Sequence, residues 1–100
     1  MASSSITLVV IYSDRIDECI SFYSRLGLHF EKEQHGQGPQ HYAAVLGDET
    51  VVEIYPANGH PTERIRLGMA LSGGHADPKL APGRHVITDP EGRKVDIHVS

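Results

Sequence analysis

Apolar and polar residues recur with different periods along the chain, and each change of period marks the boundary of an element. Residues 6–12 (ITLVVIY) form a short run rich in β-branched side chains and bounded by polar residues, which predicts a buried strand. The following apolar residues recur at helical spacing and form one stripe: Ile16, Cys19, Ile20, Tyr23 and Leu26. We therefore expect a helix over residues 14–26.

Both ends of this helix carry local signals. Ser13 or Asp14 can cap the first turn, because a side-chain oxygen can accept a hydrogen bond from a free backbone N–H there. Gly27 follows the apolar stripe at the point where a helix end favours a residue in the left-handed conformation.

Six further apolar segments predict strands separated by turns rich in glycine and proline. They are residues 28–33, 41–46, 50–55, 65–71, 84–89 and 93–99. The first half of the chain therefore has the order β-α-β-β-β. The second half repeats this order with one strand fewer and without a clear helix, because Pro78 and Pro82 interrupt the segment in which a helix would lie.

The length of 100 residues fits a single domain. Within it we expect a complete module over residues 1–55, a linker over residues 56–64 and a reduced second module over residues 65–100. The linker begins PANGHPTE, which has two prolines, an Asn-Gly pair and no apolar side chain larger than alanine. Such a segment cannot continue a strand.

The last strands of the two halves, VVEIYP and KVDIHV, share a pattern. Each places an acid between a valine and an isoleucine and then adds a ring that can form hydrogen bonds. Glu53 and Asp96 hold the matching position. Because successive side chains of a strand point to opposite faces, Tyr55 shares a face with Glu53 and His98 shares a face with Asp96.

Composition and charge narrow the classes of partner. Hydrophobic residues make up 39% of the chain and charged residues 22%, which is typical of a folded globular domain. The net charge of −4 leaves no general basic field for a phosphate backbone, so we expect no nucleic-acid partner. No stretch is long enough to span a membrane. The single cysteine, Cys19, cannot form an internal disulfide, which favours a reducing cytoplasm, and within the helical stripe it is expected to act as a small hydrophobe.

Three segments resemble the vicinal oxygen chelate superfamily, which includes glyoxalase I, the bleomycin-resistance proteins and the extradiol dioxygenases. SDRIDECISFYSRLGLHF is similar to the family's strand-to-helix segment, which ends in Phe-Tyr and Leu-Gly. HGQGPQHYAAVLGDETVVEIYP and the closing DPEGRKVDI, with its Asp-Pro-x-Gly hairpin, follow in the family's order and spacing. Together they cover most of the chain, apart from the helix of the second module.

The resemblance implies an α+β fold of paired βαβββ-type modules, in which curled mixed sheets surround a cavity and the second module lacks its helix. A metal, where the family has one, is held by a ligand from the first strand and a ligand from the last strand of each module. Glu53 and Asp96 match the last-strand positions. The first-strand positions fall on Leu8, or on Thr7 in the alternative register, and on Gly68, none of which is a credible metal ligand.

The two carboxylates have several interpretations. Alone they would bind a divalent cation only weakly, so we expect no cofactor, and Glu53 and Asp96 are weak metal candidates. Each acid can instead pair with a nearby arginine, lysine or backbone donor, and this interpretation is favoured because burying an unpaired acid is costly. A third interpretation is a cavity carboxylate that receives a cationic or amine-bearing ligand.

Seven histidines invite a metal site, but none forms an i, i+4 pair on a helix. Four of them lie in or beside loops, where histidines are usually solvated: His35, His41, His60 and His75. His41 or Tyr42, but not both, can line the cavity, and His98 shares a face with Asp96.

We favour one function over two alternatives. The favoured function is binding of a small organic molecule in the cavity without a catalytic metal. The ligand would be oriented by polar groups of the two closing strands, Glu53, Tyr55, Asp96 and His98, and by His41 of the third strand. The alternatives are a metal-dependent lyase, isomerase or dioxygenase of the same superfamily, and a non-catalytic dimeric interaction module. A half-barrel with open edges and exposed apolar surface also predicts a homodimer.

Overall fold

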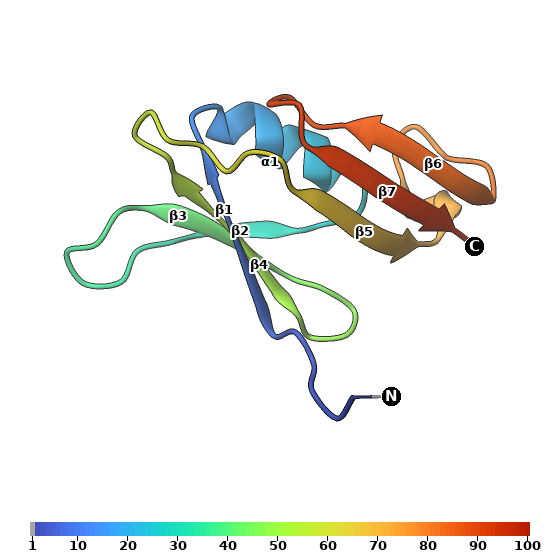
Figure 1. Ribbon diagram of the computed structural model, residues 1–100, viewed down its shortest axis with the longest axis horizontal. Helices are drawn as coiled ribbons and strands as arrows, with labels where there is room; N and C mark the ends of the chain where they lie inside the picture. Colours follow the sequence, from blue (N-terminus) through green and yellow to red (C-terminus); the bar gives the residue numbers. More distant parts are fainter. Residues whose placement is uncertain (1) are drawn as a thin grey trace.

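The structure is a computed structural model that describes residues 2–100, and it has two mixed sheets and one α-helix (Figure 1). Sheet A has the strand order β1-β4-β3-β2 and contains β1 (Leu8–Ser13), β2 (Phe30–Glu33), β3 (His41–Val45) and β4 (Val51–Pro56). Helix α1 (Ile16–Ser24) joins β1 to β2. Sheet B has the order β5-β7-β6 and contains β5 (Arg66–Leu71), β6 (Gly83–Thr88) and β7 (Lys94–Val99). The predicted α+β class is confirmed, and within residues 2–100 the second half has only a single 3₁₀ turn, η1 (Gly73–His75), where a helix would lie.

The two halves of the chain use the same strand pairing. β1 runs parallel to β4, and β5 runs parallel to β7, so that the first strand of each half lies beside its last strand. The register is also equivalent, because Val10 lies opposite Glu53 and Gly68 lies opposite Asp96. β3 and β6 pair antiparallel with β4 and β7. Sheet B therefore corresponds to sheet A without the equivalent of β2.

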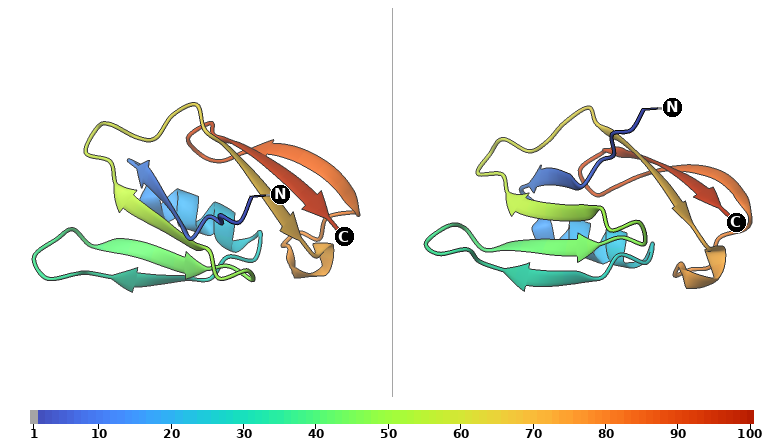
Figure 2. Two further views of the ribbon diagram at one scale, coloured as in Figure 1. Left: turned by 60° about the horizontal axis from the view of Figure 1, so that its bottom comes forward. Right: turned by 90° about the horizontal axis from the view of Figure 1, so that it is seen from below.

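The core lies where α1 meets both sheets, which are set at an angle to each other (Figure 2). Its buried members come from α1, the segment after it and both sheets: Cys19, Tyr23, Leu26, Leu28, Ala44, Ile54, Val95, Ile97 and Val99. The helical stripe predicted from the sequence thus packs against sheet A and sheet B together. In this way α1 covers the face of sheet B that a second helix would otherwise cover.

The ends of α1 differ from the prediction at the N-terminus. Arg15 occupies the N-cap position, and no side chain caps the helix. The Ser13 hydroxyl accepts a hydrogen bond from the Arg15 N–H at 2.9 Å, and Asp14 Oδ1 accepts one from the Gly59 N–H of the linker, also at 2.9 Å. Asp14 therefore holds the linker and does not start the helix. At the other end Gly27 has the expected positive φ of 101°.

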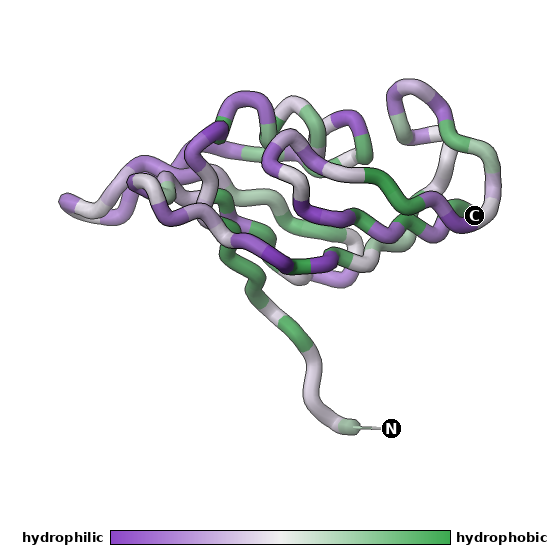
Figure 3. Tube along the Cα trace, turned by 45° about the horizontal axis from the view of Figure 1, so that its top comes forward, coloured by the Kyte–Doolittle hydropathy of each residue, from purple (hydrophilic) through white to green (hydrophobic). Residues whose placement is uncertain are grey.

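The predicted strands agree with the observed ones to within two residues at each end. β1 begins at Leu8, two residues later than predicted, and the segment before it leads away from the body of the molecule (Figure 3). The loop between β2 and β3, at the far left of Figure 3, is strongly hydrophilic. In residues 2–100 no helix has the length and apolar character required to cross a membrane.

A buried ion pair holds the turn between β6 and β7. Arg93 Nη1 lies 2.9 Å from Asp89 Oδ2, and the two side chains are 1% and 0% exposed. Arg93 also donates hydrogen bonds to the carbonyls of Tyr12 in β1 (2.6 Å) and Thr62 in the linker (2.9 Å). The Tyr23 hydroxyl of α1 donates to Asp89 Oδ2 at 2.7 Å. This network ties the second half of the chain to the first, whereas the sequence predicted only a tight turn here.

Candidate functional site

The candidate site lies on the face of sheet A that points away from the core, which we call the outer face of sheet A. Because side chains alternate along β4, Ile54 is fully buried in the core, while Glu53 and Tyr55 point the other way. The strand register places residues of all four strands on this face: Leu8, Val10, Tyr12, Glu31, Glu33, His41, Ala43, Val45, Val51, Glu53 and Tyr55. Polar groups gather at one end of the face and apolar groups at the other.

The polar end is built around His41. Its ring stacks on the ring of Tyr55, with centroids 4.1 Å apart and planes inclined by 7°, and Tyr12 lies on the other side of Tyr55 at 6.1 Å. His41 Nδ1 lies 3.2 Å from the Pro39 carbonyl, and the side chain is 1% exposed. Packing and the carbonyl together fix the orientation of the imidazole and direct Nε2 toward the neighbouring carboxylates.

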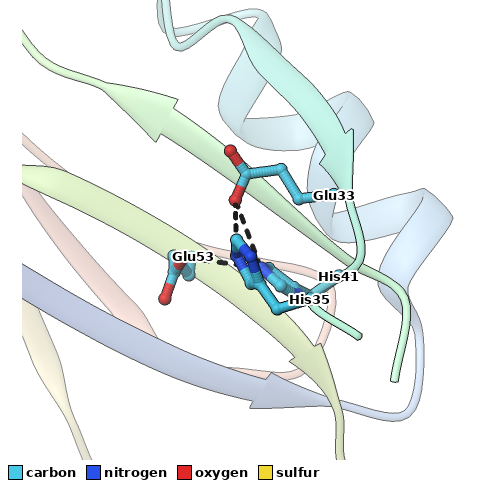
Figure 4. A group of neighbouring side chains, drawn as sticks. All are labelled: Glu33, His35, His41 and Glu53. Atoms are coloured by element: carbon cyan, nitrogen blue, oxygen red, sulfur yellow. Dashed lines mark hydrogen bonds and ion pairs between the residues drawn. The ribbon is translucent and has the colours of Figure 1, made fainter. Parts of the chain in front are cut away.

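Four side chains converge at this point (Figure 4). Glu33 comes from β2, His35 from the following loop, His41 from β3 and Glu53 from β4. His41 Nε2 lies 3.3 Å from Glu33 Oε1 and 3.5 Å from Glu53 Oε2, and His35 Nε2 lies 3.5 Å from Glu33 Oε1. One donor atom from each residue lies within 4.8 Å of all the others. We call these four residues the His–Glu cluster.

A groove of about 450 Å³ continues from the cluster toward the apolar end of the face. Its lining residues are His29, Glu31, Glu33, Ala43, Val45, Val51 and Glu53. Val45 and Leu8 at this end are 68% and 52% exposed, which is high for aliphatic side chains. The groove therefore combines carboxylates with an open apolar wall, as small-molecule sites commonly do.

Tyr55 is set up as a hydrogen-bond donor. Desolvation raises the pKa of its phenol above the ordinary value, and the nearby Glu53 carboxylate adds to this effect. The phenol therefore stays protonated at neutral pH. Together with the stacked imidazole, it offers a flat aromatic wall beside an acidic group.

Asp96 has a different environment from Glu53. Two hydrogen bonds from Arg84, of 2.8 and 2.6 Å, hold the pKa of Asp96 below its usual range, and Arg66 lies 3.8 Å away. His98 lies 3.8 Å from Asp96 and its side chain is 67% exposed. The arginine pairing expected as one interpretation is thus observed for Asp96.

The structure does not bring Glu53 and Asp96 together within one chain, so the expectation that they face a common hollow is not met. The physical reason is the position of α1. Since α1 packs against both sheets, Ile54 and Ile97 point into the shared core. Strand alternation then turns Glu53 and Asp96 away from that core, onto the outer faces of sheets A and B. Glu53, Tyr55 and His41 do come together, and Asp96 and His98 form a separate pair. On β3 it is His41, and not Tyr42, that joins Tyr55.

A second hollow lies between the two sheets and has a volume of about 330 Å³. Much of its wall is apolar, with Val9 and Val52 from sheet A, Leu67 and Met69 from sheet B, and Tyr23 from α1. Neither Glu53 nor Asp96 is among its lining residues.

The four-ligand metal site that the resemblance implies does not fit these residues. Leu8 is an exposed aliphatic side chain, and the residue directly beside Glu53 on β1 is Val10. In the second half Gly68 lies beside Asp96 and has no side chain. Neither first strand therefore supplies a donor next to the carboxylate.

Sequence reasoning missed Glu33 as a site residue and treated His35 as a solvated loop residue. The strand pairing in the β2–β3 hairpin is the feature of the sequence that could have indicated Glu33. β2 and β3 are neighbouring antiparallel strands, and the structure pairs Glu33 directly with His41. If that pairing had been worked out from the loop length, Glu33 and His41 would have been placed near Glu53, since β3 also pairs with β4.

Comparisons with known proteins agree with this architecture. A model of the Glyoxalase/Bleomycin resistance protein/Dioxygenase superfamily matches residues 5–89. The chain is similar to the crystal structure of a lactoylglutathione lyase from Agrobacterium tumefaciens, with 16% identity, a TM-score of 0.63 and coverage of 100% of this chain and 96% of that one. It is also similar to TnmS3, an antibiotic binding protein from Streptomyces sp. CB03234, with 16% identity, a TM-score of 0.65 and coverage of 99% and 98%. No curated protein sequence matches the chain.

Proposed function

The chain belongs to the glyoxalase/bleomycin resistance protein/dioxygenase superfamily, and from this premise we propose that it binds a small organic molecule on the outer face of sheet A. The observation that carries the proposal is the stack of His41 on Tyr55 directly beside Glu53. A rigid aromatic wall next to a carboxylate is suited to a flat ligand that carries a cationic or amine group. Binding of this kind does not require a catalytic metal.

The surroundings of the stack support this choice of ligand. Glu53 is 15% exposed, so its carboxylate is sheltered yet open to a ligand, and neither it nor Glu33 forms an ion pair with an arginine or lysine anywhere in residues 2–100. The aliphatic side chains of Leu8 and Val45 provide apolar contact farther along the face. TnmS3, which has a similar fold, is an antibiotic binding protein, and this supports the choice of an organic molecule as the ligand.

We further propose a homodimer in which sheet B of a second copy covers the outer face of sheet A. Leu8 and Val45 on sheet A and Val86 on sheet B are exposed apolar residues on the two outer faces. Val86 lies opposite Asp96 in the register, so this pairing would carry Asp96 and His98 of the second copy toward Glu53. The predicted ligand-binding set would then be completed across the two chains.

The dimer is tested by sedimentation velocity of the full chain. Val45→Arg is expected to shift the population to monomer, because it places an unpaired charge in the centre of the proposed contact. Ser21→Arg, an exposed position on α1, is the matched control and should leave the dimer intact. A wild-type chain that stays monomeric at high micromolar concentration contradicts this arrangement.

Ligand binding is tested on metal-free protein, prepared with a chelator, against a panel of aromatic cations by calorimetry and thermal shift. Tyr55→Leu is expected to weaken the best binder about tenfold, because aromatic stacking contributes about 0.5–1.5 kcal/mol beyond surface burial. His60→Ala, an exposed loop position, is the control and should bind as the wild type does. If no member of the panel binds, or if Tyr55→Leu binds equally well, the interaction-module alternative gains.

One observation favours a second candidate function, a metal-dependent lyase, isomerase or dioxygenase of the superfamily. The His–Glu cluster offers nitrogen and oxygen donors at one point of the same face. Turnover that appears only after metal is restored to chelator-treated protein would support this candidate over simple binding.

We place the protein in a reducing compartment such as the cytoplasm. Cys19 is a free thiol that is fully buried in the core, and the chain contains no second cysteine with which it could pair.

A further inference from the structure

We propose that the His–Glu cluster, Glu33, His35, His41 and Glu53, binds one divalent metal ion of the zinc type. Three of its four residues come from the β2–β3 hairpin, and none comes from the first strand of either half. The site therefore differs from the first-strand and last-strand site that the resemblance implies, with which it shares only Glu53. The ion would lie on the same outer face of sheet A and would compete for the Glu53 carboxylate with the cationic group of the proposed ligand, so the inference stands on separate observations and has its own test.

The spacing of the donor atoms fits a tetrahedral ion. Zinc lies about 2.0–2.1 Å from nitrogen and oxygen ligands, so two ligands of a tetrahedral site are separated by about 3.3–3.4 Å. Three of the six donor pairs of the cluster are 3.3, 3.5 and 3.5 Å apart, and the other three lie within 4.8 Å. Direct charge-assisted hydrogen bonds are shorter, at about 2.7–2.9 Å. The three known separations are therefore close to the edges of a coordination tetrahedron and longer than strong charge-assisted hydrogen bonds, although the 3.3 Å contact of His41 with Glu33 is itself a hydrogen bond.

His41 has the features of a preorganised metal ligand. Hydrogen bonding of Nδ1 to the Pro39 carbonyl leaves the lone pair of Nε2 free to face the two carboxylates. Such a contact from the second ring nitrogen is the usual way in which proteins orient a ligating histidine. Stacking on Tyr55 and near-complete burial remove the other orientations of the ring.

The negative charges of the cluster also favour binding of a cation. Glu33 and Glu53 bring two negative charges close together around a buried imidazole, and the part of the chain that the structure describes contains no arginine or lysine ion pair to either of them. Placing two like charges close together is unfavourable. A divalent ion at the centre would offset both charges and satisfy the two imidazole nitrogens at once.

The donor set determines which ions fit. Two imidazoles and two carboxylates suit zinc, and its transition-metal neighbours, better than magnesium, which prefers an octahedral shell of oxygen ligands. His35 is the most exposed of the four side chains, at 73%, and it lies in the hydrophilic β2–β3 loop. It is therefore the ligand that water or a bound molecule would replace most easily.

Titration of the metal-free full chain with zinc alone, by calorimetry, tests the site without any organic ligand. We expect one ion per chain, no comparable binding of magnesium, and an intense tetrahedral-type visible spectrum when cobalt replaces zinc. Glu33→Gln and Glu53→Gln preserve side-chain size but remove a charged ligand, and each should weaken zinc binding at least about tenfold. Glu63→Gln and His60→Ala, at exposed positions of the linker, are the matched controls and should bind zinc as the wild type does.

Three results would overturn the proposal: no zinc binding by the wild type, unchanged binding in Glu33→Gln, or loss of binding in Glu63→Gln. Circular dichroism of each variant establishes that it is folded before its affinity is compared. Because the organic ligand panel is measured with chelator present, a failure of zinc binding and a failure of ligand binding are seen separately.

Discussion

Replacing Arg93 by methionine should cost the protein much of its stability, because this side chain joins the two halves of the chain. It pairs with Asp89 and Glu91, each at 2.9 Å, and donates to the carbonyls of Tyr12 and Thr62. Methionine has a similar length and fills much of the same space, so the change removes charge and hydrogen bonds more than volume. The orientation of sheet B relative to sheet A depends on these contacts.

The size of the effect follows from what remains after the substitution. Removing one partner of a buried ion pair typically costs about 3–5 kcal/mol, because the other charge stays buried. Asp89 keeps three donors, the Tyr23 hydroxyl and the N–H groups of Glu91 and residue 93, at 2.7–3.0 Å. This compensation places Arg93→Met at the lower end of the range, about 3 kcal/mol. That is a large share of the about 5–15 kcal/mol by which domains are usually stable.

Urea unfolding followed by circular dichroism measures the difference through the shift of the midpoint at constant slope. Arg84→Met is the matched control, because Arg84 also pairs with an aspartate but its side chain is 55% exposed. Exposed pairs contribute about 0–1 kcal/mol, so the control should lie close to the wild type. If the two variants lose the same stability to within about 0.5 kcal/mol, the reasoning from burial is refuted.

Three further predictions follow from particular residues. Burial alone would raise the pKa of Asp89, but hydrogen bonds hold it below its usual 3.8. This carboxylate therefore stabilises the fold above pH 3.8, and the stabilisation is lost as the pH falls through the lowered pKa. The urea unfolding midpoint should fall less on acidification in Asp89→Asn than in the wild type, provided that the variant folds. Gly73→Ala should cost about 1–3 kcal/mol, since an added Cβ would collide with the Leu80 carbonyl, whereas Gly74→Ala meets nothing within 4 Å and serves as the control in the same melting experiment. Desolvation raises the pKa of the fully buried Cys19, so a thiol reagent should label it slowly in the native state and rapidly in urea, and fast native labelling would contradict the burial of α1 against both sheets.

The elements of the fold could be predicted from the sequence because their periods are clear. The stripe that begins at Ile16 packs as one face of α1 and continues to Leu26 just after the helix, and alternation around Ile54 and Ile97 correctly separates core from surface. The start of α1 could not be predicted, because Asp14 was free, in sequence terms, either to cap the helix or to bind the linker, and the tertiary contact with Gly59 decides this.

The site could be predicted only in part. Glu53, Tyr55 and His41 share a face because strand alternation and the β3–β4 pairing are local properties. The relation between Glu53 and Asp96 depends on which side of sheet B meets α1, and no local pattern reports that. The role of Arg93 could not be predicted for a similar reason, since it donates hydrogen bonds to the linker and to β1, which lie far away in the sequence.

The ligand site that we propose is the outer face of sheet A around His41, Tyr55 and Glu53. A two-dimensional amide NMR titration of the metal-free chain with the best-binding aromatic cation tests it most directly. The account predicts that the largest shifts fall on β3 and β4 at the residues beside the stack, and that they disappear in Tyr55→Leu. Shifts concentrated instead on Val52, Leu67 and Met69, which line the hollow between the sheets, would contradict it.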